Sequence, residues 1–183
     1  MFNTQALSKV VKVFFIALIL ITIFFQILMW QAAPNGFNEF GFFEAWFSGG
    51  IFSHYEVMYE MSLGKKILGF GITMLYECFN LAIYWMLYKL FDLFSKREYF
   101  SLKVVNFIKK AGLFYLIKTV FYPFYEILLS FFTTMDNPEG HRMISVSFSL
   151  NNLADILLGL ILFVTASIMY EGVKLKNESN LTV

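Results

Sequence analysis

The sequence predicts an all-α fold, an integral membrane bundle of four transmembrane helices with an inner interfacial amphipathic helix. Of the 183 residues, 58% are hydrophobic and 20% are aromatic, while charged residues make up 15%, against about 25% in a typical soluble domain. Four stretches are apolar over the roughly 20 residues that a membrane-crossing helix needs. A soluble domain of this size cannot bury so much apolar surface. We therefore expect residues 1–183 to form a single membrane domain.

The first two spans are predicted at about 13–30 and 67–88. The first follows two lysines and contains no charge, so it resembles a signal peptide at first sight. Its apolar run is too long for an ordinary signal peptide, and Gln31-Ala32-Ala33 is a poor cleavage site, so we expect it to remain as an anchor. The second span contains one charge, Glu77.

The third and fourth spans, at about 111–132 and 150–170, contain more polar groups. In the third span, apolar side chains contribute on the order of −4 to −7 kcal/mol to insertion, and Lys118 and Glu126 together oppose it by about 5 kcal/mol. We therefore expect both charges to face the bundle rather than lipid. Pro123 is expected to kink this helix, and the fourth span contains Asp155 near its start.

The distribution of Lys and Arg predicts the orientation of the spans. Ten of these residues lie in the N-terminus, in the segment 89–110 and in the C-terminal tail, whereas Lys65, Lys66 and Arg142 lie on the other side. Both termini and the loop 89–110 are therefore predicted to be cytoplasmic, and the loops 31–66 and 133–149 external. The expected location is the cell (plasma) membrane, as a multi-pass protein.

The first external loop is unusually aromatic. A loop free in water would not tolerate this composition, so we expect it to lie against the outer interface or to cap the bundle, with a short helix near 55–63. A lid over a ligand is the alternative interpretation.

The cytoplasmic loop 89–110 ends in an amphipathic pattern. Apolar residues recur at helical spacing from Phe100 to Ala111, and polar ones fall on another face. Ser101 is a suitable N-cap. One interpretation is a topology signal attracted to anionic lipid. The other is a docking surface for a cytoplasmic partner, for which the candidates are Lys103, Asn106, Lys109, Lys110 and, in the tail, Lys174.

Four ionisable residues lie within the predicted spans. From the helical rise of 1.5 Å per residue, Glu77 and Lys118 are expected close enough in depth for their side chains to meet, and Glu126 and Asp155 are expected as neighbours near the outer leaflet. Such residues are candidates for a proton, ion or substrate path, although pairs of opposite charge can simply orient a bundle. The two interpretations remain open at this point.

Several classes of function lack support in the sequence. The net charge of +1 does not indicate direct nucleic-acid binding. The single cysteine, Cys78, excludes an internal disulfide framework, and the outer trio His54, Glu56 and Glu60 matches no recurring metal site. We find no catalytic motif, so we expect no enzyme, no cofactor and no metal. A homo-oligomer is possible, but no residue pattern indicates one.

Two sequence features resemble a known family. Tyr99-Phe100-Ser101 leads into a basic amphipathic stretch that ends at Lys110-Ala111-Gly112, and the chain ends in a tail that runs from Glu171-Gly172 to Leu181-Thr182-Val183. With the four spans and the large first outer loop, these resemble the bacterial membrane family filed as domain of unknown function number twenty-nine seventy-five.

The resemblance implies a bacterial inner-membrane protein without an established activity. Members of the family are often encoded beside a small helix-turn-helix regulator, which implies a membrane partner for a transcription factor. Asn177 and Asn180 stand where the family commonly has Glu and Asp. We therefore expect a non-enzymatic binding or regulatory partner of a cytoplasmic protein, and the alternative is a small proton- or ion-coupled transporter or transport subunit.

Overall fold

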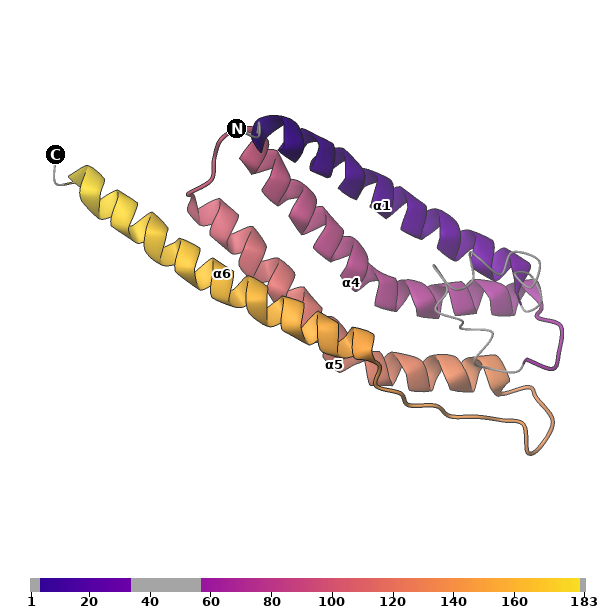
Figure 1. Ribbon diagram of the computed structural model, residues 1–183. Coiled ribbons are helices and arrows are strands. Elements are labelled where there is room, and N and C mark those ends of the chain that lie inside the picture. The colour runs from indigo at the N-terminus through magenta and orange to yellow at the C-terminus, as the bar shows by residue number, and fades with distance from the viewer. Residues whose placement is uncertain (1–3, 34–56, 182–183) are drawn as a thin grey trace. The chain divides into compact units, whose positions relative to one another are not determined.

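Four long helices make up the described part of the chain (Figure 1). The computed structural model describes residues 4–33 and 57–181, and no strand occurs within these ranges. The helices are α1 (Thr4–Ala32), α4 (Leu63–Ser95), α5 (Leu102–Thr134) and α6 (Leu150–Leu181). Each is long and apolar enough to cross a membrane. The predicted four-helix membrane bundle is confirmed. Most of the first outer loop, including its aromatic run, lies outside the described residues.

Helices α1, α4 and α5 extend beyond the predicted spans at both ends, and α6 extends beyond its span at the C-terminal end. A helix of 33 residues, such as α4 or α5, rises about 50 Å, whereas the hydrocarbon core of a bilayer is about 30 Å thick. The ends of these helices therefore lie outside the hydrocarbon region. Residues 57–62 are not helical, so the short helix expected near 55–63 is wrong over these residues.

The predicted amphipathic helix forms the first part of α5, the helix that also contains the third predicted span. α5 runs from Leu102 to Thr134 without interruption and includes Pro123. Its apolar face packs inside the bundle, where Val104, Ile108 and Ala111 are buried. The polar residues of the same turns are consequently fixed on a rigid scaffold.

The chain divides into two compact units, and each has its own apolar core. Unit 1 comprises residues 1–19, 79–120 and 149–183, and unit 2 comprises residues 20–78 and 121–148. The core of unit 1 contains Leu90, Val104, Val105, Ile108, Ala166 and Val173. The core of unit 2 contains Met29, Trp30, Ala33, Met61, Leu129 and Phe132. Because lipid tails are as apolar as these side chains, close packing rather than escape from water holds such cores together.

The boundary between α4 and α5 is set by two local motifs in unit 1. The amide of Glu98 donates to the carbonyl of Leu93 (3.0 Å), and the amide of Arg97 donates to that of Phe94 (3.1 Å). This pattern is a Schellman motif, which requires a left-handed residue, and Arg97 adopts it with φ of 63°. The hydroxyl of Ser101 then accepts the amide of Val104 (3.3 Å), so the predicted N-cap is confirmed.

Candidate functional site

The exposed face of the first turns of α5 carries the residues predicted for partner docking. Lys103, Asn106, Lys109 and Lys110 are all exposed. The opposite face of the same turns packs in the core of unit 1, where Val104 and Ala111 have exposed fractions of 0%. The three lysines therefore project from a fixed helix, and the surface formed by these four residues is named the basic face below.

The C-terminal end of α6 lies at the same end of unit 1 as the basic face. Val173 belongs to the core cluster that holds Val104 and Ile108, so its neighbour Lys174 is brought close to the start of α5. Lys174 is exposed, and its Nζ lies 3.9 Å from Oε1 of Glu178, one turn further along α6. The tail thus continues as a helix beyond the predicted span, and it carries two lysines and two glutamates between residues 171 and 178.

A polar network that the sequence did not predict ties α1 to α4 at this end. Asp92 accepts from Lys12 (2.8 Å) and from Lys96 (2.7 Å). Gln5 donates to the carbonyl of Ser95 (3.3 Å), and Thr4 and Tyr99 are joined through their hydroxyls. The only local signal was the spacing of four between Asp92 and Lys96, which is typical of a helical ion pair.

These ion pairs change the protonation of Asp92, which lies beyond the predicted span 67–88. The hydrogen bonds from Lys12 and then Lys96 lower the pKa of the Asp92 carboxyl from 3.8 to about 2, although partial burial acts in the opposite direction. The carboxylate therefore stays charged at every physiological pH. Asp92 thus forms ion pairs with two of the ten Lys and Arg residues from which the cytoplasmic side is predicted.

An ion pair between α5 and α6 lies within the predicted spans. Nζ of Lys118 is 2.7 Å from Oδ2 of Asp155, and their side chains are 12% and 16% exposed. Sequence reasoning expected Asp155 to neighbour Glu126, and that pairing is wrong, because Asp155 pairs with Lys118. A buried pair of this kind satisfies both charges, and breaking it by removing one partner leaves an uncompensated charge.

Two glycines allow α5 and α6 to approach closely beside this ion pair. A Cβ atom added to Gly112 would lie 2.9 Å from the carbonyl oxygen of Gly159. A Cβ atom on Gly159 would lie 2.9 Å from the side chain of Leu116. Small residues at such contacts are typical of membrane helix pairs, and the contact sets the level at which Lys118 meets Asp155.

Glu126 belongs to a polar ladder on α5 in unit 2. Its carboxylate accepts the amide and the hydroxyl of Ser147. One turn further along α5, the hydroxyl of Ser130 accepts a hydrogen bond from the amide of Ser145. After a second turn, the hydroxyl of Thr134 accepts a hydrogen bond from the amide of Met143. The amides of alternate residues from 143 to 147 thus bond to side chains that are spaced four residues apart on α5. Glu126 is 7% exposed, and its role here is to hold this segment.

Glu77, the remaining intramembrane candidate, is partly buried on α4.

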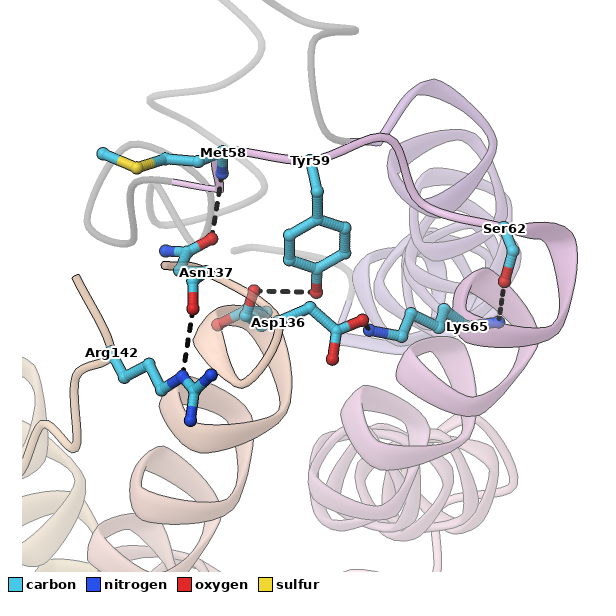
Figure 2. Close-up of polar contacts among 8 residues, drawn as sticks. Met58, Tyr59, Ser62, Lys65, Asp136, Asn137 and Arg142 are labelled. Atoms are coloured by element: carbon cyan, nitrogen blue, oxygen red, sulfur yellow. Dashed lines mark hydrogen bonds and ion pairs between the residues drawn. The ribbon is translucent and has the colours of Figure 1, made fainter. Parts of the chain in front are cut away.

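A second polar cluster joins the start of α4 to the end of α5 in unit 2 (Figure 2). Asn137 has an exposed fraction of 0%, and its amide group accepts from the amide of Met58 and donates to the carbonyl of His141, both at 3.0 Å. Lys65 forms an ion pair with Asp136. The hydroxyl of Tyr59 donates to the carbonyl of Thr133 (3.0 Å). Sequence reasoning did not single out Asn137, because a lone Asn in a loop gives no pattern.

Within residues 4–33 and 57–181, no group of three His, Cys, Asp or Glu side chains could hold a metal ion. His54 and Glu56 of the outer trio lie outside the described residues. The geometry therefore offers two candidate sites in unit 1, the basic face and the Lys118–Asp155 pair.

Comparison with protein families finds a match to the family described as "Protein of unknown function (DUF2975)", over residues 50–183. The matched range contains α4, α5 and α6, and α1 precedes it. It confirms the resemblance drawn from residues 99–112 and from the tail. No curated protein and no solved structure matches the chain.

Proposed function

The chain belongs to the family described as "Protein of unknown function (DUF2975)", and we propose that it is a non-enzymatic membrane anchor for a cytoplasmic regulatory protein. The partner binds the basic face formed by Lys103, Asn106, Lys109 and Lys110. The observation that carries this proposal is the exposure of all four side chains on a helix whose other face is buried.

The chemistry of the basic face specifies the kind of partner. Three exposed ammonium groups on about two helical turns attract an acidic surface and speed its encounter with the membrane-bound protein. The N-terminus, the segment 89–110 and the tail carry the excess of Lys and Arg, which favours a cytoplasmic position for this end. An acidic surface on a small helix-turn-helix regulator meets both requirements.

Co-purification with a matched control tests the proposal. The tagged protein is solubilised gently from its native cells, and the proteins that accompany it are identified. The test variant carries Lys103→Gln, Lys109→Gln and Lys110→Gln. The control variant carries Lys9→Gln, Lys89→Gln and Lys176→Gln, so both lose three positive charges. We expect a soluble regulator to accompany the wild type and the control, and to be lost from the test variant.

Two results would contradict the anchor proposal. The first is capture of the same regulator by the test variant at the wild-type level. The second is a wild-type preparation that contains only lipid and the protein.

A second candidate function rests on the ion pair between Lys118 and Asp155, because ionisable residues inside the membrane commonly mark proton or ion paths. In this case the protein is a small proton- or ion-coupled transporter or transport subunit that uses Glu77, Lys118, Glu126 and Asp155. Glu77→Gln, which leaves the Lys118–Asp155 ion pair intact, is expected to abolish proton-coupled flux into liposomes while the protein remains folded. Glu178→Gln, on the exposed end of α6, serves as the control and should leave the flux unchanged.

A further inference from the structure

A groove of about 210 Å³ lies between the end of α1 and the start of α4, within unit 2. Its walls include the apolar side chains of Ile27, Trp30, Leu63, Ile67 and Phe70. Lys66 is the one charged residue among the described residues that line it. A groove of this composition suits a molecule that is apolar along most of its length and negative at one end.

Lys66 is available to bind such a negative group. Its Nζ donates to the carbonyl oxygen of Gln31 at the end of α1 (2.9 Å), and an ammonium group has two further N–H donors. The neighbouring Lys65 is already paired with Asp136. Over the ranges 4–33 and 57–181, by contrast, Lys66 forms no ion pair. The positive charge at the groove is therefore not neutralised by a described carboxylate.

Trp30 gives the groove a fixed wall. The indole Nε1 donates to the hydroxyl of Thr73 (2.9 Å), and the six-membered ring lies against Gly69, where an added Cβ would come within 2.0 Å of it. Only glycine allows so close an approach. Because hydrogen bond and packing both restrain the ring, the groove is largely formed before any ligand enters it.

By the bounds of the predicted spans, the groove extends from the level of the headgroups into the hydrocarbon region. Lys66 precedes the predicted span 67–88 by one residue, so it lies near the level of the headgroups. Phe70 lies four residues further along α4, which corresponds to about 6 Å of helical rise. Ile27 lies similarly inside the end of the predicted first span, 13–30. On the membrane side of Lys66, the wall of the groove is formed by apolar residues that include Phe70 and Ile27. This part of the groove therefore follows the order of a phospholipid, with the charged headgroup at the surface and the acyl chain below it.

We propose that this groove is a binding site for an anionic phospholipid, whose phosphate group meets Lys66 and whose acyl chain lies along Trp30 and Phe70. The charge complementarity favours a lipid over an apolar protein segment, because such a segment would leave the ammonium group of Lys66 without a counter-charge. The site is separate from the basic face, which lies in unit 1, so it does not depend on the proposed anchor function.

Fluorescence quenching of Trp30 tests the site directly. The chain contains three Trp residues, so Trp46→Phe and Trp85→Phe leave Trp30 as the only indole. The full-length protein is reconstituted into phosphatidylcholine vesicles, and either phosphatidylglycerol or phosphatidylcholine with brominated acyl chains is added in increasing mole fraction. Bromine quenches the indole only at close range, so quenching reports an acyl chain in the groove.

We expect brominated phosphatidylglycerol to reach half-maximal quenching at an about fivefold lower mole fraction than brominated phosphatidylcholine, as a Lys near the membrane surface favours anionic lipid to about this extent. Lys66→Gln should remove this preference and Lys66→Arg should retain it. Lys96→Gln, which removes one charge in unit 1, should also retain it. The unquenched emission spectrum of Trp30 in each variant verifies that the groove is still folded.

Three outcomes would overturn the proposal. Equal quenching by the two lipids in the wild-type groove would mean that any acyl chain enters it without recognition of the headgroup. Absence of quenching by both lipids would mean that protein covers the groove. An undiminished preference in Lys66→Gln would assign the recognition to other residues.

Discussion

At the scale of single residues, a buried polar side chain can hold together segments that lie far apart in the sequence, and Asn137 is an example. Asn137 joins the segment before α4 to the segment after α5, because its side chain accepts from the amide of Met58 and its backbone carbonyl accepts from Nε of Arg142 (3.0 Å) (Figure 2). Its side chain also donates to the carbonyl of His141. A buried polar group that loses its partner retains the full cost of its desolvation. Asn137 therefore determines how the chain enters α4 and leaves α5.

We predict that Asn137→Ala lowers the free energy of unfolding by about 1–3 kcal/mol, because the amide of Met58 and the carbonyl of His141 lose their partner. Denaturant titration in mild detergent, followed by circular dichroism, measures this change. Asn106→Ala, at an exposed position of α5, is the matched control and should change the value by less than about 0.5 kcal/mol. Equal effects of the two substitutions would contradict the structural role of Asn137.

Asp92 gives a prediction for the dependence of stability on pH. Its folded pKa of about 2 lies below the ordinary value of 3.8, so the unfolded state binds the proton more readily. The stabilisation is thus complete above pH of about 4 and is lost as the pH falls through about 2. We expect the wild type to melt at a higher temperature than Asp92→Asn at pH 6.

This difference in melting temperature should shrink between pH 4 and 2. Thermal melts of both proteins over this range, in one detergent, provide the measurement. A difference that is the same at pH 6 and at pH 2 would show that the substitution acts through packing and not through charge.

At the scale of elements, the contact between α5 and α6 determines which polar groups meet. Gly112 and Gly159 are in backbone contact, and six residues beyond Gly112 the side chain of Lys118 finds Asp155, four residues before Gly159. The two helices run antiparallel, so these offsets correspond to nearly the same level along both. The glycine contact and the ion pair therefore support the same register.

Gly112→Ala is predicted to lower the free energy of unfolding by about 1–3 kcal/mol, because its methyl group would meet the backbone of Gly159 and force the helices apart. Gly71→Ala is the control, since nothing lies within 4 Å of a Cβ at Gly71. Alanine has the higher helix propensity by about 1 kcal/mol, so Gly71→Ala should be neutral or stabilising. Unfolding in increasing fractions of denaturing detergent distinguishes the two signs.

At the scale of the whole molecule, the distribution of charge predicts the orientation in the membrane. The ten Lys and Arg residues assigned to the cytoplasm outnumber the three assigned to the outside, and this bias sets the orientation of small membrane proteins. The anchor proposal for the basic face requires this orientation, because the regulator reaches only the cytoplasmic side.

Single-cysteine labelling measures the orientation. In a Cys78→Ser background, Glu139→Cys should react with an impermeant maleimide in intact cells, whereas Lys176→Cys should react only after the membrane is permeabilised. The opposite pattern would place the basic face outside the cell and would rule out a cytoplasmic regulator as its partner.

Length and hydropathy of the sequence were sufficient to identify the four membrane helices, because backbone groups in lipid must be satisfied within each segment and this requires about 20 apolar residues. Local patterns were also sufficient for the N-cap at Ser101 and for the two faces at the start of α5. These features depend on neighbours within a few residues of each other in the chain.

The partners of the charges depended on tertiary structure. Depth along a helix does not specify its rotation or its neighbour, so the sequence predicted Glu126 beside Asp155, while Asp155 pairs with Lys118 and Glu126 holds Ser147. The groove at Lys66 likewise requires Trp30 to lie against Gly69. Such contacts join residues that are 21 to 43 positions apart, and only tertiary packing brings them together.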